Sequence, residues 1–160
     1  MGKVLKKFTN GWPGAVSRSI DDIIISMKNG SGSEIAFGTP LFLSTSDNTA
    51  KPFDASTSTP ETFLGIAVRS ADKTPEEYGG NEGKYKAGDP VEVLVRGSTV
   101  LCFENNASAG SSVYIRKSDK KLVTSPGAEG TTVLLPGVTV RNSRDANRAT
   151  EVVLTKRNIY

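Results

Sequence analysis

The feature that most constrains the fold is a series of short runs of β-branched residues, each closed by glycine, proline or polar turn residues, with almost no helical periodicity. The clearest run is Val91–Arg96, in which apolar and polar side chains roughly alternate. Gly97-Ser98 follows as a two-residue turn, and Thr99–Phe103 is the returning strand of a predicted hairpin. Ser112–Arg116 and Lys121–Thr124 flank four polar residues and predict a second hairpin. Short antiparallel strands of this kind are typical of a small β-barrel or a β-sandwich.

The same pattern predicts strands along the rest of the chain. These further strands are Ile20–Ser26, Leu41–Ser44, Phe63–Arg69, Thr131–Leu135, Val138–Arg141 and Glu151–Lys156. A chain of 160 residues fits one domain of ordinary size and is long enough to bury a hydrophobic core. We therefore predict a single all-β domain.

Two segments are predicted to lie outside the compact part of this domain. Residues 1–19 contain the string Gly11-Trp12-Pro13-Gly14 and no periodic pattern, so we expect an extended N-terminal arm, followed by a β-rich domain over residues 20–160. Residues 71–90 carry five Asp and Glu residues together with Pro75 and several glycines. We expect this stretch to form a long acidic loop, and loops of this length in small domains are usually functional.

The charge is unevenly distributed, although its sum is only +3. Residues 1–20 carry +4 and residues 141–160 carry +3, whereas residues 21–90 carry −5. Basic ends around an acidic middle suit a nucleic acid or an acidic protein surface as partner. A surface that binds nucleic acid usually has aromatic residues among its basic residues, and in this sequence few aromatic residues lie near the lysines and arginines. The pattern therefore favours a protein partner, with no specific nucleic acid expected.

The residue types needed for most catalytic and metal sites are scarce. The sequence has no histidine and one cysteine, Cys102, which excludes His-based triads, an internal disulfide and a multi-cysteine zinc site. We expect Cys102 to be a small buried thiol. The strings Ser118-Asp119-Lys120-Lys121 and Ser46-Asp47-Asn48 match motifs of penicillin-recognising enzymes, but in reversed order and in too short a chain. We expect no enzyme, cofactor or metal site; a hydrolase with dispersed carboxylates stays open as an alternative.

Nothing in the sequence predicts a membrane partner. No stretch approaches the roughly 18 consecutive apolar residues of a transmembrane helix. The basic start, Met1–Phe8, lacks the apolar region of a signal peptide. We therefore expect the protein to be assembled in a cytoplasm.

Several strings resemble one known family in their order along the chain. They are Gly11–Arg18, Phe37–Leu41, Phe63–Arg69, Asp72–Pro75, Gly88–Gly97, Asp145–Asn147 and Glu151–Asn158. Together they resemble the structural cement, or head decoration, proteins of tailed bacteriophages over nearly the whole chain. One departure is Arg148, which stands where glycine is expected, so the turn at Asp145–Asn147 is expected to differ in type.

The resemblance implies a non-enzymatic decoration protein of the virion. Proteins of this kind bind the outside of the icosahedral head, often as trimers, and stabilise it against the pressure of the packaged DNA. The implied partners are the major capsid protein and further copies of the chain. The alternative function is a small β-barrel that binds nucleic acid through the basic termini.

The expected arm supplies the candidate contacts with the capsid or a neighbouring subunit. Its lysines can meet carboxylates on the partner, while its two aromatic residues act as apolar anchors. The candidate contact residues are Lys3, Lys6, Lys7, Phe8, Trp12 and Arg18. Trp12 has a second interpretation, because it can also cap the domain's own core.

Overall fold

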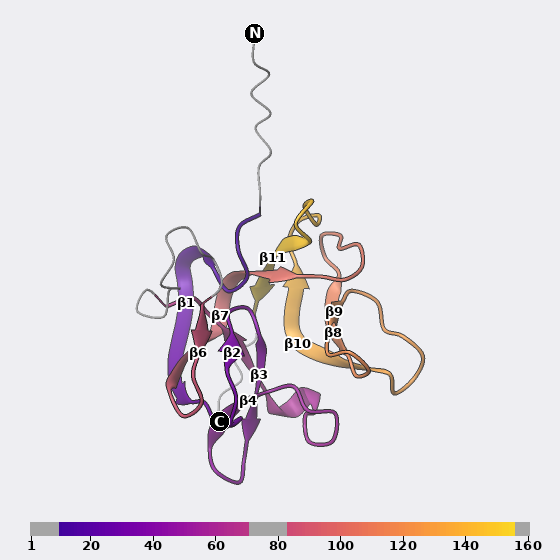
Figure 1. Cartoon of the computed structure of the whole chain (residues 1–160). Helices are drawn as coiled ribbons and strands as arrows, with labels where there is room; N and C mark the ends of the chain where they lie inside the picture. The colour runs from indigo at the N-terminus through magenta and orange to yellow at the C-terminus, as the bar shows by residue number, and fades with distance from the viewer. Residues whose placement is uncertain (1–9, 71–82, 156–160) are drawn as a thin grey trace.

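The computed structural model describes residues 10–70 and 83–155, and these residues fold into an almost entirely β structure (Figure 1). Its elements are β1 (Val16–Lys28), β2 (Ile35–Ala36), β3 (Pro40–Ser44), β4 (Thr49–Pro52), a 3₁₀ turn (Pro60–Thr62), β5 (Phe63–Ala67), β6 (Lys84–Tyr85), β7 (Pro90–Cys102), β8 (Ser112–Arg116), β9 (Leu122–Val123), β10 (Thr132–Val140) and β11 (Ala149–Leu154). The predicted all-β class is confirmed.

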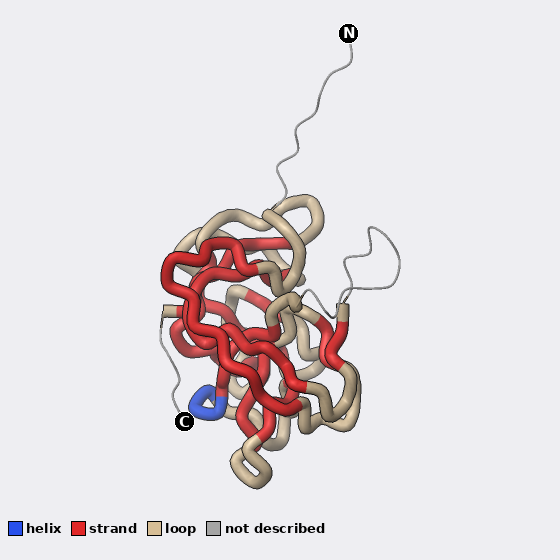
Figure 2. The backbone as a smooth tube through the Cα atoms, turned by 90° about the vertical axis from the view of Figure 1, so that its left-hand side faces the viewer, coloured by secondary structure: helices blue, strands red, loops and turns tan. Residues whose placement is uncertain are grey.

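One strongly curled antiparallel sheet dominates the described part of the chain. Its strand order is β4-β3-β5-β7-β11-β10-β8-β9, and β1 pairs with β7 outside this path. The strands wrap around the core as a half-barrel (Figure 2). A bridge between Asn29 and Ala50 brings the end of β1 next to β4, so the β1-β7-β5-β3-β4 part curls back on itself. β2 and β6 form a separate two-stranded sheet.

The central strands bury both faces, which gives the fold two hydrophobic clusters. Ile66 of β5 and Leu94 of β7 belong to the larger cluster, whereas their chain neighbours Ala67 and Val93 belong to the smaller one. This alternation follows from the two-residue period of a strand. The smaller cluster also holds Ile35, Phe37 and Tyr85 from the region of the two-stranded sheet. The Phe37 and Tyr85 rings meet edge to face at 5.5 Å between centroids, and the Tyr85 hydroxyl donates to the Val68 carbonyl at 2.6 Å.

The predicted hairpin around Gly97-Ser98 is wrong, because these two residues lie inside β7, which is one continuous strand of 13 residues. The residues before Gly97 pair with β5, and those from Gly97 to Cys102 pair with β11. Gly97 has φ +124°, a value that side chains rarely allow, so it kinks the strand where the ladder changes partner. A glycine-serine pair thus serves here as an irregularity within a strand.

Three further predictions from the sequence, which concern the second hairpin, the strands on either side of Pro136-Gly137 and the acidic loop, have different outcomes. The second predicted hairpin is confirmed as the β8–β9 pair, with Tyr114 opposite Val123. The two strands predicted on either side of Pro136-Gly137 form a single strand, β10, with an irregular register between Leu134 and Thr139. Within the stretch predicted as the 71–90 acidic loop, residues 71–82 lie outside the described residues, while β6 pairs with β2.

Candidate functional site

The described chain begins at Asn10, which is bound to the connection between β10 and β11. The Asn10 backbone N–H donates to Asp145 Oδ2 at 2.8 Å. Its side-chain amide donates to the carbonyls of Ser143 and Ala149, both at 2.9 Å. Because these partners come from the C-terminal end of the chain, residue 10 has a fixed position on the domain.

A tight turn around Gly14 then leads the chain into β1. The Gly14 N–H donates to the Val100 carbonyl, and the Arg69 N–H donates to the Gly14 carbonyl, each at 2.9 Å. Gly14 has φ +76°, and a Cβ there would lie 2.7 Å from the Gly38 nitrogen and 2.9 Å from the Ala67 oxygen. The turn therefore admits only glycine without a backbone shift. β1 then begins at Val16, within the stretch assigned to the arm, and only residues 1–9 of the predicted arm lie outside the described residues.

The structure places two of the six predicted contact residues, Trp12 and Arg18. Trp12 keeps 48% of its surface exposed, so it is not a fully buried cap of the core. The Arg18 side chain is 60% exposed and pairs with Glu151 of β11. Lys3, Lys6, Lys7 and Phe8 lie outside the described residues.

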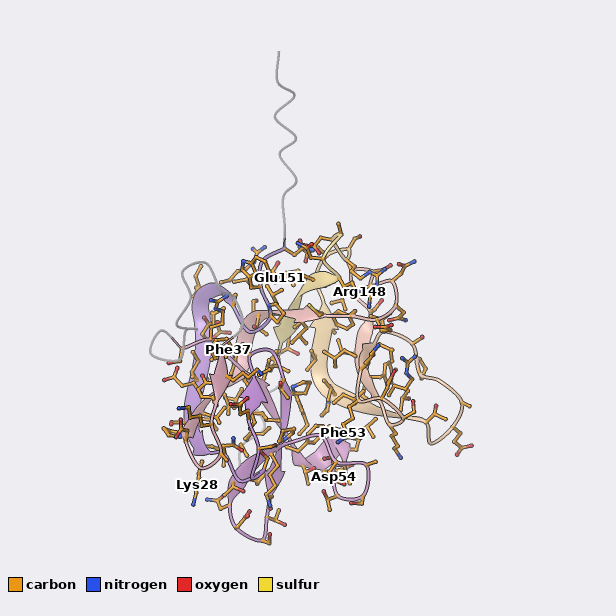
Figure 3. All side chains as sticks on the ribbon, viewed as in Figure 1. Lys28, Phe37, Phe53, Asp54, Arg148 and Glu151 are labelled. Atoms are coloured by element: carbon orange, nitrogen blue, oxygen red, sulfur yellow. The ribbon has the colours of Figure 1, made fainter. Side chains whose placement is uncertain are left out.

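The pair between Arg18 and Glu151 ties the start of β1 across β7 to β11. Arg18 Nε donates to Glu151 Oε1 at 2.8 Å, and the Ser17 hydroxyl donates to the same oxygen at 2.9 Å. Burial raises the pKa of Glu151, but the hydrogen bonds from Arg18 and Ser17 outweigh it and leave the pKa below its usual value. Figure 3 shows Glu151 at the end of the molecule where the described chain begins, with Lys28 at the opposite end of β1.

Exposed apolar side chains recur along the chain from this point. The large hydrophobic residues that the described part of the chain exposes are Trp12 (48%), Val16 (36%), Ile20 (99%), Ile24 (43%) and Leu134 (39%). The first four follow one another at every fourth residue and end within β1, and we call them the edge patch. Large apolar side chains that recur at the surface of one short stretch of chain are candidates for an interaction site, so the edge patch is the strongest candidate on the described surface.

The exposure of Ile20 has a clear backbone cause. Arg18 is paired with Ser98, and Ile23 is paired with Arg96. Between these two pairs β1 advances by five residues, whereas β7 advances by only two. The extra residues bulge out of the ladder and carry Ile20 away from the core. Beyond the bulge, Ile23, Ile25 and Met27 pack against the smaller cluster, and Ile24 between them is left outside.

Sequence reasoning found Trp12 but missed Val16, Ile20 and Ile24. The four-residue spacing of these residues is visible in the sequence. That signal is weak, because regular alternation puts residues four apart on the same face of a strand but does not tell which face is buried. The bulge in the β1 ladder accounts for the full exposure of Ile20.

Beside Trp12 the surface is hollowed over about 460 Å³, with Pro13, Phe37 and Cys102 in its lining. Cys102 is exposed, which corrects the prediction of a buried thiol: Leu101 points into the core and its neighbour Cys102 points out. Partial burial in this hollow raises the pKa of the Cys102 thiol. A raised pKa lowers the fraction of the reactive thiolate at a given pH.

The basic residues of the adjacent region are paired with carboxylates. Glu104 Oε2 accepts from Arg148 Nη1 at 3.0 Å and lies 3.2 Å from Lys121 Nζ. Arg116 donates to Asp119, whose pKa this pair lowers to about 2. Arg148 itself has φ +63°, which is the left-handed conformation that the expected glycine would adopt more readily.

No catalytic arrangement emerges among residues 10–70 and 83–155. This part of the chain holds no group of three or more His, Cys, Asp or Glu side chains that could bind a metal ion. Nor does it contain a helix with the length and hydropathy needed to cross a bilayer.

Comparisons with known proteins identify relatives. Residues 3–155 match the sequence profile of the family described as structural cement protein (E217 gp24/Pam3 gp6). A chain from the capsid of Myoviridae phage XM1 has a similar fold, with a TM-score of 0.67 and 22% identity, over 97% of this chain and 96% of that chain. The N base of the head fibre gp8.5 of bacteriophage phi29 gives a TM-score of 0.43 and 11% identity, over 86% of this chain and 99% of that one. No curated protein sequence matches the chain.

Proposed function

The chain belongs to the phage structural cement protein family and has a capsid decoration role, and from this premise we propose that it binds the outer surface of the head and stabilises it. It works without catalysing a reaction. It is made in the cytoplasm of the host and joins the head there. Because it binds the assembled lattice and not the separate shell subunits, binding shifts the assembly equilibrium toward the intact head.

The match of residues 3–155 to the cement family carries this proposal, and the edge patch supports it. A curled sheet that buries both faces of its central strands is stiff, because its main-chain groups are paired and its interior is packed. A stiff body with exposed apolar residues on one strand is suited to holding larger neighbours in place.

The partners are the major capsid protein and further copies of the chain, with a trimer as the favoured assembly. The contacts are made by the N-terminal residues Lys3, Lys6, Lys7 and Phe8, together with Trp12 and Arg18. Lysines at the rim of an interface mainly set the association rate and its salt dependence, whereas buried aromatic anchors dominate affinity. Several simultaneous contacts from one oligomer raise the effective concentration of each remaining contact.

Nucleic acid binding has less support than a protein partner. Arg18 forms an ion pair with Glu151, and Arg148 forms one with Glu104. Charges already paired with carboxylates attract phosphates less, because the nearby negative charge cancels most of their field.

Heads that lack the protein provide the direct test. Purified protein is added to undecorated heads, and its occupancy is measured by sedimentation and densitometry. Loss of DNA is then followed as the temperature rises. We expect decorated heads to keep their DNA to a higher temperature than bare heads. Equal heat resistance at full occupancy would refute the stabilising role, and absence of binding would refute the capsid assignment.

A truncation tests the contribution of the N-terminal residues. Removing residues 2–9 leaves Asn10 and the Gly14 turn with all their hydrogen bonds to the domain. The truncated chain should therefore fold with an unchanged melting temperature but occupy fewer sites on the head at the same concentration. The matched control replaces Lys3, Lys6 and Lys7 by Gln, which removes charge but keeps the apolar residues. Full occupancy by the truncated chain would show that these residues make no contact.

A further inference from the structure

We infer that the edge patch on β1 binds the N-terminal segment Lys3–Phe8 of a second copy of this chain, so that neighbouring copies are linked head to tail. The inference deepens the oligomeric arrangement in the proposed function, and it relies on that function only for its place on the head. It names the surface that receives the segment, which the comparisons leave open.

The first support is the state of β1 itself. The strand pairs with β7 alone, so the main-chain groups along its other edge have no ladder partner within residues 10–70 and 83–155. Val16, Ile20 and Ile24 stand on this same strand with 36%, 99% and 43% of their surfaces exposed. A long edge strand with exposed β-branched residues is the kind of surface that accepts another extended chain.

The second support is the chemistry of the segment that would bind there. Lys3-Val4-Leu5-Lys6-Lys7-Phe8 contains three apolar residues and three lysines. The apolar side chains are suited to cover the exposed isoleucines. The lysines are suited to Asp21, on the bulge beside Ile20, whose side chain is 67% exposed and, among the described residues, forms its ion pair with the half-exposed Arg96. Exposed pairs of this kind are weak, so a lysine can share the carboxylate at little cost.

The third support is geometric and makes the contact one between copies. Thr99 of β7 pairs with Val16 of β1 and also with Val152 of β11, so β1 and β11 lie on opposite edges of β7. Asn10 is bonded on the β11 side, to the carbonyl of Ala149. The chain's own segment therefore starts on the β11 side, two residues from Trp12, and Ile24 is the member of the edge patch that lies farthest from it along β7.

Positions along β7 separate the two sites further. Ala149 is paired with Cys102, whereas Ile24 is paired with Leu94. The eight residue steps between these positions span at most about 26 Å, and the kink at Gly97 shortens this distance. Phe8 is two residues from Asn10 and stays within roughly 7 Å of it. Ile24 is therefore the position of the edge patch least accessible to Phe8 of the same copy, and a covalent link between Phe8 of one variant and Ile24 of another reports a second copy.

Heads decorated with two cysteine variants test this contact. Both carry C102S, which removes the natural exposed thiol. One then carries F8C and the other I24C. The two proteins are mixed in equal amounts, added to heads and oxidised gently, and the covalent species are identified by mass spectrometry in the bound and the free fractions. We expect a disulfide-linked heterodimer of the two variants. The matched control replaces I24C by L134C, which sits on β10 with nearly the same exposure as Ile24.

Each outcome decides the inference. A heterodimer with I24C that exceeds the L134C control at least tenfold supports it. Equal yields with both partners show random collision and overturn it. Linkage of I24C to the shell protein alone overturns it as well and assigns the edge patch to the capsid. If neither variant cross-links although both bind the head, the inference fails while the capsid assignment stands. If heterodimers form in solution but nothing binds the head, the capsid assignment fails while the inference stands.

A second measurement avoids cysteine chemistry. I24K and L134K add the same charge at exposed positions on different strands. Light scattering should show that I24K weakens self-association at least tenfold, while L134K and the wild type associate equally. Equal association of all three proteins would contradict the role of the edge patch.

Discussion

Two of the strands at the edges of the main sheet, β1 and β9, differ in what covers their outer edges. β9 has two residues, Leu122 and Val123, and both are buried. Its outer edge is closed by the chain itself, because the Glu104 N–H donates to the Leu122 carbonyl at 3.0 Å and the Thr124 N–H donates to Asn105 Oδ1 at 3.1 Å. Nothing apolar remains exposed on this strand.

β1 is a much longer strand, with 13 residues, and it exposes three large apolar side chains. Its protection against unwanted pairing consists of the bulge at residues 19–22, which itself carries the fully exposed Ile20, and of the charged residues Arg18, Asp21, Asp22 and Lys28. Proteins that stay single usually keep edge strands short, charged or covered. The contrast is that the chain itself closes the outer edge of β9, whereas the outer edge of β1 has no ladder partner within residues 10–70 and 83–155, and this is the edge that our inference assigns to a second copy.

The largest loss of stability is expected from a substitution at Gly14, where the chain enters β1. G14A places a Cβ against the backbone of Gly38 and Ala67 and strains a positive φ, so it should lower the free energy of unfolding by about 3 kcal/mol. The control is G110A, just before β8, where φ is +84° but nothing lies within 4 Å of the new Cβ. Strain alone should cost G110A about 1–2 kcal/mol. Urea denaturation measures both, and equal losses would mean that the Gly14 turn can shift away from the sheet.

An intermediate effect is expected at Glu151, which anchors the start of β1. E151Q keeps the shape of the side chain but removes the charge that Arg18 and Ser17 bind, and should cost about 1 kcal/mol at pH 7, since Arg18 is mostly solvated. The folded-state pKa of Glu151 is lowered, so its contribution is complete above the usual glutamate pKa of about 4.3 and is lost as the pH falls through the folded value. The stability difference between wild type and E151Q should therefore shrink on acidification.

E104Q provides the comparison beside β9, where the Glu104 N–H donates to the Leu122 carbonyl. Glu104 also has a lowered pKa, through Lys121 first and Arg148 after it, but its ion pairs are solvated. The free energy of unfolding that E104Q loses at pH 7 should be smaller than the loss caused by E151Q. This loss should become smaller still when salt is added. Thermal unfolding from pH 3 to 7 at two salt concentrations measures this. A larger loss for E104Q than for E151Q would reverse the ranking of the two regions.

The sequence predicts what depends on local pattern and misses what depends on neighbouring strands. The all-β class and the β8–β9 hairpin follow from alternation and from polar turn residues, which act within a few positions. Gly97-Ser98 has the local composition of a turn, but β5 pairs with the residues of β7 before it and β11 with the residues from Gly97 onward. These two ladders keep β7 extended through Gly97-Ser98. Which face a residue takes is equally non-local, so neither the exposure of Cys102 nor that of Ile20 could be read from composition.

The smallest effect, with the opposite sign, is expected at Arg148, on the closed side of the molecule. This position follows the Asp145–Asn147 turn, which the sequence predicted, and its φ of +63° explains why glycine was expected there. R148G relieves a strain of about 1–2 kcal/mol, but it also frees the unfolded chain by about 0.5–1 kcal/mol and removes a solvated ion pair with Glu104. The net gain in unfolding free energy should therefore stay below about 1 kcal/mol. R148K keeps the strain and should match the wild type within error in thermal denaturation. A loss of stability in R148G alone would show that the ion pair with Glu104 outweighs the strain, and the region beside β9 would then depend on its surface charges as well as on its main-chain hydrogen bonds.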